Sequence, residues 1–124
     1  MLFRSPYLAS WTAGRRTLAA RYRERLSGAA GIDVLPECDP GHVYHLFVVR
    51  AASRDNLQDT LASLGIETLV HYPVSLDEQQ AFHADRPDRC PEARAACATV
   101  LSLPLHPGMT AEDVDYVAAA LSAR

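Results

Sequence analysis

Apolar residues recur at helical spacing in three stretches of the chain. In each stretch a stripe of apolar side chains is separated by polar ones, the pattern of a helix that packs one face against a core. Gly28 and Gly65 stand where the first two helices are expected to end, because glycine readily adopts the left-handed conformation of a C-terminal cap. The stripes are Trp11, Leu18, Tyr22 and Leu26 in residues 12–27; Leu57, Leu61 and Leu64 in residues 54–64; and Val114, Val117 and Leu121 in residues 113–122.

Other helix signals are local. Ser53 is a candidate N-cap for the second helix, and Thr110 with Asp113 forms a variant of the capping box before the last helix. Pro91 suits the first turn of a further helix, PEARAACATV. A short helical stretch, LDEQQAFHA, is expected over residues 76–84.

Two shorter stretches are rich in β-branched and aromatic residues. HVYHLFVVR, residues 42–50, is too short and too apolar for a surface helix and predicts a buried or half-buried strand. GIETLVHYP, residues 65–73, predicts a second strand, which Pro73 ends because proline cannot donate to a strand ladder. LSLPLHP, residues 101–107, predicts another extended segment, whereas GIDVLPECDPG, residues 31–41, predicts an extended connection.

Strands interleaved with helices in 124 residues indicate one small α/β (α+β) domain. The expected architecture is a two-layer sandwich, in which helices pack on one face of a mixed or antiparallel sheet of about three strands. Residues 1–11 show no cap and no period of their own, so they predict a lead-in segment. Residues 12–124 predict the domain itself.

Charge and cysteine content narrow the classes of partner. The net charge of −3 and the pI near 5.9 argue against nucleic-acid and membrane partners, because both attract clustered cations. The one basic cluster, RRTLAARYRER, predicts a solvated helix face. The sequence shows neither a signal peptide nor a membrane span, and its three cysteines form no C-x-x-C pair, which indicates a reduced, cytoplasmic protein. The cluster holds Arg15, Arg16, Arg21, Arg23 and Arg25, and the cysteines are Cys38, Cys90 and Cys97.

Motifs of known mechanism are absent from the sequence. It contains no P-loop, no G-x-G-x-x-G and no G-x-S-x-G, and no pair of histidines has the H-E-x-x-H spacing of a zinc site. Cys90 and Cys97 lack a histidine at ligand spacing, and Cys97, which lies among alanines, is expected to be a small core residue. No metal ligand and no catalytic residue is therefore assigned. The histidines are His42, His45, His71, His83 and His106.

Several pieces of the sequence, taken in order, resemble the C-terminal domain of the DegT/DnrJ/EryC1/StrS aminotransferases. They are RRTLAARYRERL, HVYHLFVVR, SRDNLQDTLASLGIETLVHYPVSLDEQQAF and CPEARAACATVLSLPLHPGMTAEDVDYVAAAL. The resemblance runs from about Trp11 to Leu121 and rests on the H-Y-P turn after L-x-x-x-G-I-x-T, on L-S-L-P-x-H-P, and on the last helix. It implies the small domain of a fold-type I enzyme that uses pyridoxal phosphate to transfer amino groups to keto-sugar nucleotides in amino-sugar biosynthesis.

The resemblance implies that His71 and Tyr72 are substrate-binding residues. With Pro73 they form a turn that faces the cofactor and sugar-nucleotide cleft in the family, where an imidazole and a phenol can hydrogen-bond hydroxyls or phosphate. The structural alternative is that Tyr72 packs in the core while His71 caps the strand end. Arg50, at the end of its strand, is a candidate for binding an anion, and a solvated arginine is the ordinary interpretation.

The chain departs from the family in two respects. The family's Schiff-base lysine and its phosphate-binding and ring-stacking residues belong to a large N-terminal domain, whereas this sequence contains no lysine at all. Arginine cannot replace it, because the guanidinium stays protonated, so no cofactor is expected on this chain alone. The usual H-Y-P-x-P-L-H-x-Q run is also altered, with Ser75 in place of the proline and Asp77 in place of the histidine.

The sequence therefore predicts a C-terminal aminotransferase domain that is inactive alone, as a fragment of a longer frame or a truncated relic. Its partner is the missing N-terminal pyridoxal-phosphate domain or a second copy in a homodimer. The alternative is a free-standing binding module that completes a split aminotransferase, which an adjacent reading frame for the lysine domain would favour. A regulatory ligand-binding domain of another family would make the ordered matches a coincidence.

Overall fold

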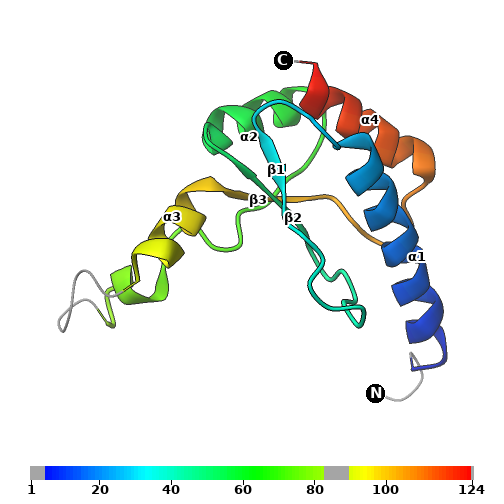
Figure 1. Cartoon of the computed structure of the whole chain (residues 1–124), viewed down its shortest axis with the longest axis horizontal. Helices are drawn as coiled ribbons and strands as arrows, with labels where there is room; N and C mark the ends of the chain where they lie inside the picture. Colours follow the sequence, from blue (N-terminus) through cyan, green and yellow to red (C-terminus); the bar gives the residue numbers. More distant parts are fainter. Residues whose placement is uncertain (1–4, 83–89, 124) are drawn as a thin grey trace.

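The chain forms a small antiparallel sheet with helices packed on it, in a computed structural model that describes residues 5–82 and 90–123 (Figure 1). The expected two-layer α/β sandwich is confirmed, and its sheet is antiparallel. The elements are α1 (Ser5–Arg25), β1 (Ile32–Val34), β2 (Phe47–Ala51), α2 (Arg54–Ser63), the 3-10 turn η1 (Leu76–Glu78), α3 (Pro91–Thr99), β3 (Val100–Leu103) and α4 (Ala111–Ser122).

The strand order is β1-β2-β3, with β2 in the centre. Val49 of β2 lies opposite Val34 of β1 on one side and Leu101 of β3 on the other. Beyond β3, the chain pairs at a single bridge between Leu69 and Ser102. The Ser102 amide donates to the Leu69 carbonyl at 2.8 Å, and the Leu69 amide donates to the Ser102 carbonyl at 3.2 Å. The bridge ties the segment before His71 to the outer edge of the sheet.

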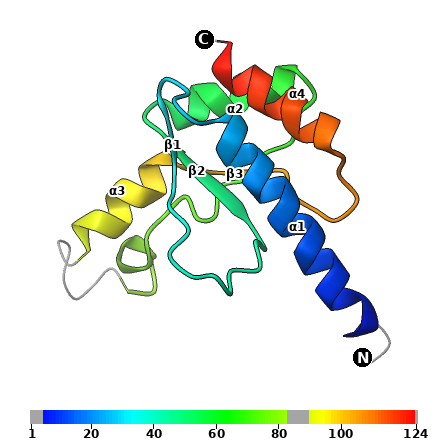
Figure 2. The ribbon, with the colours of Figure 1, turned by 45° about the vertical axis from the view of Figure 1, so that its right-hand side comes forward.

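Helices α1, α2 and α4 cover one face of this sheet (Figures 1 and 2). Successive side chains of a strand point to opposite faces, so Phe47, Val49 and Ala51 all lie in the core beneath the helices, and each is buried. Val48 and Arg50, between them, face the other way and are more exposed. The fully buried side chains that fill the core include Tyr22, Leu26, Leu57, Leu61, Leu101, Val114 and Leu121.

The strands differ from the expected ones in length and place. Residues 65–73 were expected to form a strand, but they make only the bridge at Leu69. The strand expected over residues 42–50 is β2, which begins only at Phe47, because a loop with Tyr44 at a φ of 48° precedes it. In the expected connection, residues 32–34 form β1, which is three residues long and too short to give a pattern of its own.

The helices follow their sequence signals more closely. α4 begins after Thr110, which exchanges hydrogen bonds with Asp113 in a complete capping box, and α3 begins at Pro91. Ser53 occupies the N-cap position of α2 but makes no side-chain capping bond. Over residues 76–84 the structure has only the turn η1, and residues 83–84 lie outside the described part.

Helix α1 begins at Ser5, seven residues before the expected residue 12. The lead-in segment is therefore helical over residues 5–11, while residues 1–4 lie outside the described part. Tyr7 and Trp11, one turn apart, stack with ring centroids 5.9 Å apart. This end of α1 extends away from the sheet in both views (Figures 1 and 2), so its apolar residues have no core to produce an amphipathic period.

The basic cluster on α1 is bonded to other parts of the chain, contrary to the expected solvated face. Arg15 Nε donates to the Val43 carbonyl at 2.9 Å, and Arg16 donates to the Pro40 carbonyl at 2.6 Å. Arg23 donates to the carbonyl of Leu35 at 2.7 Å. These bonds hold the loop between β1 and β2 against the helix. The loop carbonyls have no neighbouring strand to bond with, and the arginine side chains supply hydrogen-bond donors in its place.

Two further arginines join α1 to α4. Arg21 binds both carboxylate oxygens of Asp115, at 2.8 and 2.6 Å, and Arg25 binds the same two oxygens at 2.9 and 3.2 Å. The hydrogen bonds from Arg21 and then Arg25, with the charges of both guanidinium groups, lower the pKa of the Asp115 carboxyl to about 2. The ionised form of Asp115 therefore joins α1 to α4 through a partly exposed group of ion pairs.

Acidification should weaken this fastening. Because the pKa of Asp115 is about 2 in the folded chain and about 3.9 in an unfolded one, its contribution is complete above about pH 4 and is lost as the pH falls towards 2. In urea unfolding at about pH 6, Asp115→Asn should lower the midpoint, and the difference from the unchanged chain should shrink at about pH 2. Asp59→Asn, which removes an exposed charge on α2, is the matched control. A midpoint difference independent of pH would contradict this role.

Candidate functional site

The predicted site residues lie in a turn that leaves the outer edge of the sheet. The bridge between Leu69 and Ser102 brings the chain alongside β3, and His71 follows two residues later. The peptide bond between His71 and Tyr72 is cis. The two rings meet edge to face, with centroids 5.7 Å apart and planes at 86°. The turn therefore carries an imidazole and a phenol side by side.

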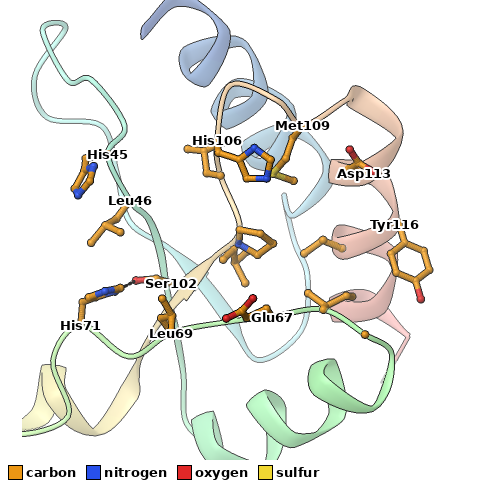
Figure 3. Close-up of a pocket in the computed structure, with 16 residues that line it drawn as sticks. His45, Leu46, Glu67, Leu69, His71, Ser102, His106, Met109, Asp113 and Tyr116 are labelled. Atoms are coloured by element: carbon orange, nitrogen blue, oxygen red, sulfur yellow. Dashed lines mark hydrogen bonds between the residues drawn. The ribbon is translucent and has the colours of Figure 1, made fainter. Parts of the chain in front are cut away.

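His71 is held by the sheet. Its Nδ1 lies 3.0 Å from the Ser102 hydroxyl oxygen, as the dashed line in Figure 3 shows. Ser102 is only 5% exposed and lies opposite Val48, on the sheet face away from α1, α2 and α4. The imidazole is half-buried. Ser102 could not be predicted as a site residue from the sequence, because a serine in the run LSLPLHP carries no signal of its side-chain partner.

Tyr72 lies outside the core and is exposed to solvent. Its side chain is 71% exposed, so the structural alternative in which it packs inside the domain is wrong. Val74, two residues on, is also an exposed apolar residue. The structure does tie His71 to the strand end, as that alternative expected, but through Ser102 of a neighbouring strand. Of the two predicted site residues, one is held by the sheet and the other is open to solvent.

The other end of the turn is fixed by α3. Arg94 binds Asp77 Oδ2, from Nε at 3.0 Å and from its terminal nitrogen at 2.8 Å, and the Ser75 hydroxyl donates to Glu78 at 2.7 Å. Ser75 and Asp77 are the two positions that depart from the family's run. Both side chains interact within the domain here. Position 77 thus contributes an ion pair that supports the turn.

A groove of about 610 Å³ begins at His71 and runs along the sheet edge to α4 (Figure 3). His45, which precedes β2, and His106, which follows β3, line it together with His71. Their separation along the chain gave no reason to expect them in one groove. Within residues 5–82 and 90–123, no group of three or more His, Cys, Asp and Glu side chains is placed to hold a metal ion. The groove is lined also by Leu46, Glu67, Leu69, Ser102, Met109, Asp113 and Tyr116.

The remaining candidates lie elsewhere. Arg50 is exposed and lies directly opposite Asp33 in the sheet register, beside a hollow bordered by α3. Cys97 is half-buried and is not among the residues of the hydrophobic core, so the expectation of a core position for it is wrong. Cys38 and Cys90 are exposed. His83 lies outside the described part. In the part that the structure describes, no helix is long and apolar enough to cross a membrane.

Comparison with known proteins places this arrangement in a family. The profile of the DegT/DnrJ/EryC1/StrS aminotransferase family matches residues 4–122. Among curated relatives, the erythromycin biosynthesis sensory transduction protein EryC1 of Saccharopolyspora erythraea is 40% identical over 122 residues, which cover 94% of this chain and 33% of that protein. The dTDP-3-amino-3,4,6-trideoxy-alpha-D-glucose transaminase of Streptomyces venezuelae is 40% identical over 109 residues, which cover 84% and 28%.

Solved structures give the same result. The chain superposes on DesV of Streptomyces venezuelae, crystallised with a ketimine intermediate, with a TM-score of 0.86 and 36% identity over 97% of this chain and 33% of that one. A DegT/DnrJ/EryC1/StrS aminotransferase of Brucella abortus gives a TM-score of 0.88 at 25% identity, over 99% and 33%. The chain thus spans about a third of the length of these relatives and corresponds to their C-terminal part. The chain belongs to the DegT/DnrJ/EryC1/StrS aminotransferase family.

Proposed function

We propose that this chain supplies the C-terminal domain of a pyridoxal-phosphate-dependent aminotransferase that acts on keto-sugar nucleotides, with His71 and Tyr72 as substrate-binding residues. The observation that carries the proposal is the turn at residues 71–75, which is fixed at both ends and yet leaves Tyr72 71% exposed. A rigid turn with an exposed polar tip is typical of a binding site. The relatives support the substrate class, since they include transaminases of dTDP- and UDP-linked sugars.

The chain's own residues do not fit the cofactor. Pyridoxal phosphate supplies the electron sink for amino-group transfer and is held in such enzymes through a lysine Schiff base. The sequence contains no lysine, and its twelve cationic side chains are all arginine. An arginine does not form the Schiff base, because it stays protonated. The lysine must therefore come from another domain, on the same or a separate polypeptide, and this chain alone does not transaminate.

The contribution of this chain is to bind and orient the sugar nucleotide. The Tyr72 hydroxyl can donate a hydrogen bond to the substrate or accept one from it, and the His71 ring has a second nitrogen beyond the one that meets Ser102. Sugar hydroxyls and phosphate oxygens are the groups that such side chains recognise. Because the turn is bonded to β3 and to α3, it reaches the substrate with little loss of conformational entropy.

Exposed apolar side chains mark where the lysine domain would dock. Tyr7 and Leu8 of α1 are 58% and 57% exposed, and Leu76, next to the turn, is 66% exposed. Apolar surface of this kind on a small domain is typical of an interface. Docking there would turn the open groove beside His71 into an enclosed cleft. A second copy of the chain is the other partner that such a surface would accept.

The fold should tolerate changes in the turn better than changes in the core. Tyr72→Phe should change the free energy of unfolding by less than about 0.5 kcal/mol, because the hydroxyl is exposed. His71→Ala should cost about 1–2 kcal/mol, since it removes the partner of the buried Ser102 hydroxyl. Leu61→Ala, at a position with 0% exposure, should cost about 2–5 kcal/mol. Urea unfolding measures all three. A loss for Tyr72→Phe equal to that for Leu61→Ala would make the tyrosine structural.

A chimera tests the function itself. This chain would replace the matching segment of the Streptomyces venezuelae transaminase, whose remainder would supply the lysine domain expected of the family and whose name gives a dTDP-sugar as the ligand to assay. The chimera should bind pyridoxal phosphate and transaminate, and Tyr72→Phe should lower kcat/KM per folded molecule by about two- to tenfold, the value of one net hydrogen bond. The chain alone, treated with pyridoxal phosphate and borohydride, should carry no reduced adduct on a side chain.

Ser63→Ala is the control, because Ser63 is an exposed residue of α2 outside the groove and its hydroxyl donates to the Thr60 carbonyl at 2.7 Å. This substitution should leave kcat/KM of the chimera unchanged. A chimera that is loaded with cofactor and active, but indifferent to changes at both His71 and Tyr72, would contradict the proposal.

A further inference from the structure

The interaction between Ser102 and His71 is more constrained than an ordinary surface hydrogen bond. Ser102 is 5% exposed, and both of its backbone groups are used in the bridge to Leu69, at 2.8 and 3.2 Å. Only its hydroxyl remains to be satisfied. Within the described residues, the sole hydrogen-bond partner of that hydroxyl is Nδ1 of His71, at 3.0 Å. Ser102 thus holds Leu69 through its backbone and His71 through its side chain.

The buried hydroxyl selects one form of the neutral imidazole. If Nδ1 carried the proton, it would donate to the serine oxygen, and the hydroxyl hydrogen of Ser102 would be buried without an acceptor. A buried donor without a partner loses its hydration and gains nothing in return. If the hydroxyl donates to Nδ1, its hydrogen is satisfied, and the ring proton must then lie on Nε2. The second arrangement gives both the hydroxyl hydrogen and Nδ1 a partner, and it leaves the ring proton on Nε2, the nitrogen of the half-buried ring that faces no bonded partner within the described residues.

We propose that Ser102 is a positioning residue, which holds His71 in the Nε2–H form so that the ring offers a hydrogen-bond donor to an acceptor oxygen of the sugar nucleotide. The proposal rests on the proposed function for its ligand, but the ring form is a property of this chain alone. Nε2 makes no hydrogen bond to any residue within 5–82 and 90–123, so it is available to a ligand. The bridge at Leu69 fixes where the ring stands, and the hydroxyl fixes which nitrogen donates.

The ring form is measured directly in the isolated chain. Long-range ¹H–¹⁵N correlation spectra of the chain distinguish a ring protonated at Nε2 from one protonated at Nδ1. They are recorded at a pH high enough for the imidazole to be neutral. The His71 signals should show a single Nε2–H form. Ser102→Ala should release the ring into a mixture of both forms, and Ser102→Thr, which keeps the hydroxyl, should restore the single form. His106, whose Nδ1 accepts from the Gly108 amide, is the internal control and should not respond.

A ring of His71 protonated at Nδ1, or an Nε2–H population unaffected by Ser102→Ala, would overturn the proposal. Urea unfolding of the variants verifies that each remains folded, so that a change in the spectrum is not a loss of structure.

The ligand half of the proposal is tested in the chimera described above. Ser102→Ala should raise KM for the dTDP-sugar by about two- to tenfold with little change in kcat, because one orienting hydrogen bond is lost, and Ser102→Thr should restore it. A chimera that responds to Tyr72→Phe but not to Ser102→Ala would refute the role of Ser102 while leaving the proposed function standing. A chimera that responds to no change at His71, Tyr72 or Ser102 would refute the function, and the spectra of the isolated chain would still decide the ring form.

Discussion

Burial of one face of a three-stranded sheet is the constraint on which the rest of the structure depends. Tyr22, Leu61 and Leu121 come from three helices and pack against the same face of the sheet, where Val49 and Leu101 are fully buried. Side chains alternate along a strand, so the residues between those that pack in the core must point to the opposite face of the sheet. Ser102 points away from the helices because its neighbours Leu101 and Leu103 point towards them. A shift of β3 by one residue would place a leucine under His71.

Outside the core, ion pairs and carbonyl contacts hold the segments that have little regular structure. Arginines of α1 bind the carbonyls of the loop before β2 and the carboxylate of α4, and Arg94 of α3 binds Asp77 at the end of the turn. Guanidinium groups suit this role because one side chain can satisfy several acceptors. All twelve cationic side chains are arginine, and several of them hold the fold together in this way. The same composition leaves the chain without a lysine amine, on which aminotransferase chemistry depends.

The sequence predicted features that depend on local interactions, and it failed where distant segments decide. The capping box of Thr110 and the position of Pro91 are local, and both were correct. Residues 65–73 have the composition of a strand, yet they meet β3 only at Leu69, because strand length depends on the partner edge. The partnership of His71 with Ser102, 31 residues away, needed the folded sheet. Tyr72 is 71% exposed, which excludes a core position, and its role in substrate binding stays a prediction.

The central claim is that the turn faces a cleft completed by a lysine-bearing domain, and hydroxyl-radical footprinting tests it most directly. Tyr72 and Leu64 are 71% and 45% exposed in this chain, so both should be oxidised when the chain is alone. In the chimera loaded with cofactor, the oxidation rate of Tyr72 should fall several-fold while that of Leu64, which lies outside the groove, stays within about twofold of its value in the isolated chain. Equal rates for Tyr72 in the two proteins would show that the turn remains in solvent, and the claim would be wrong.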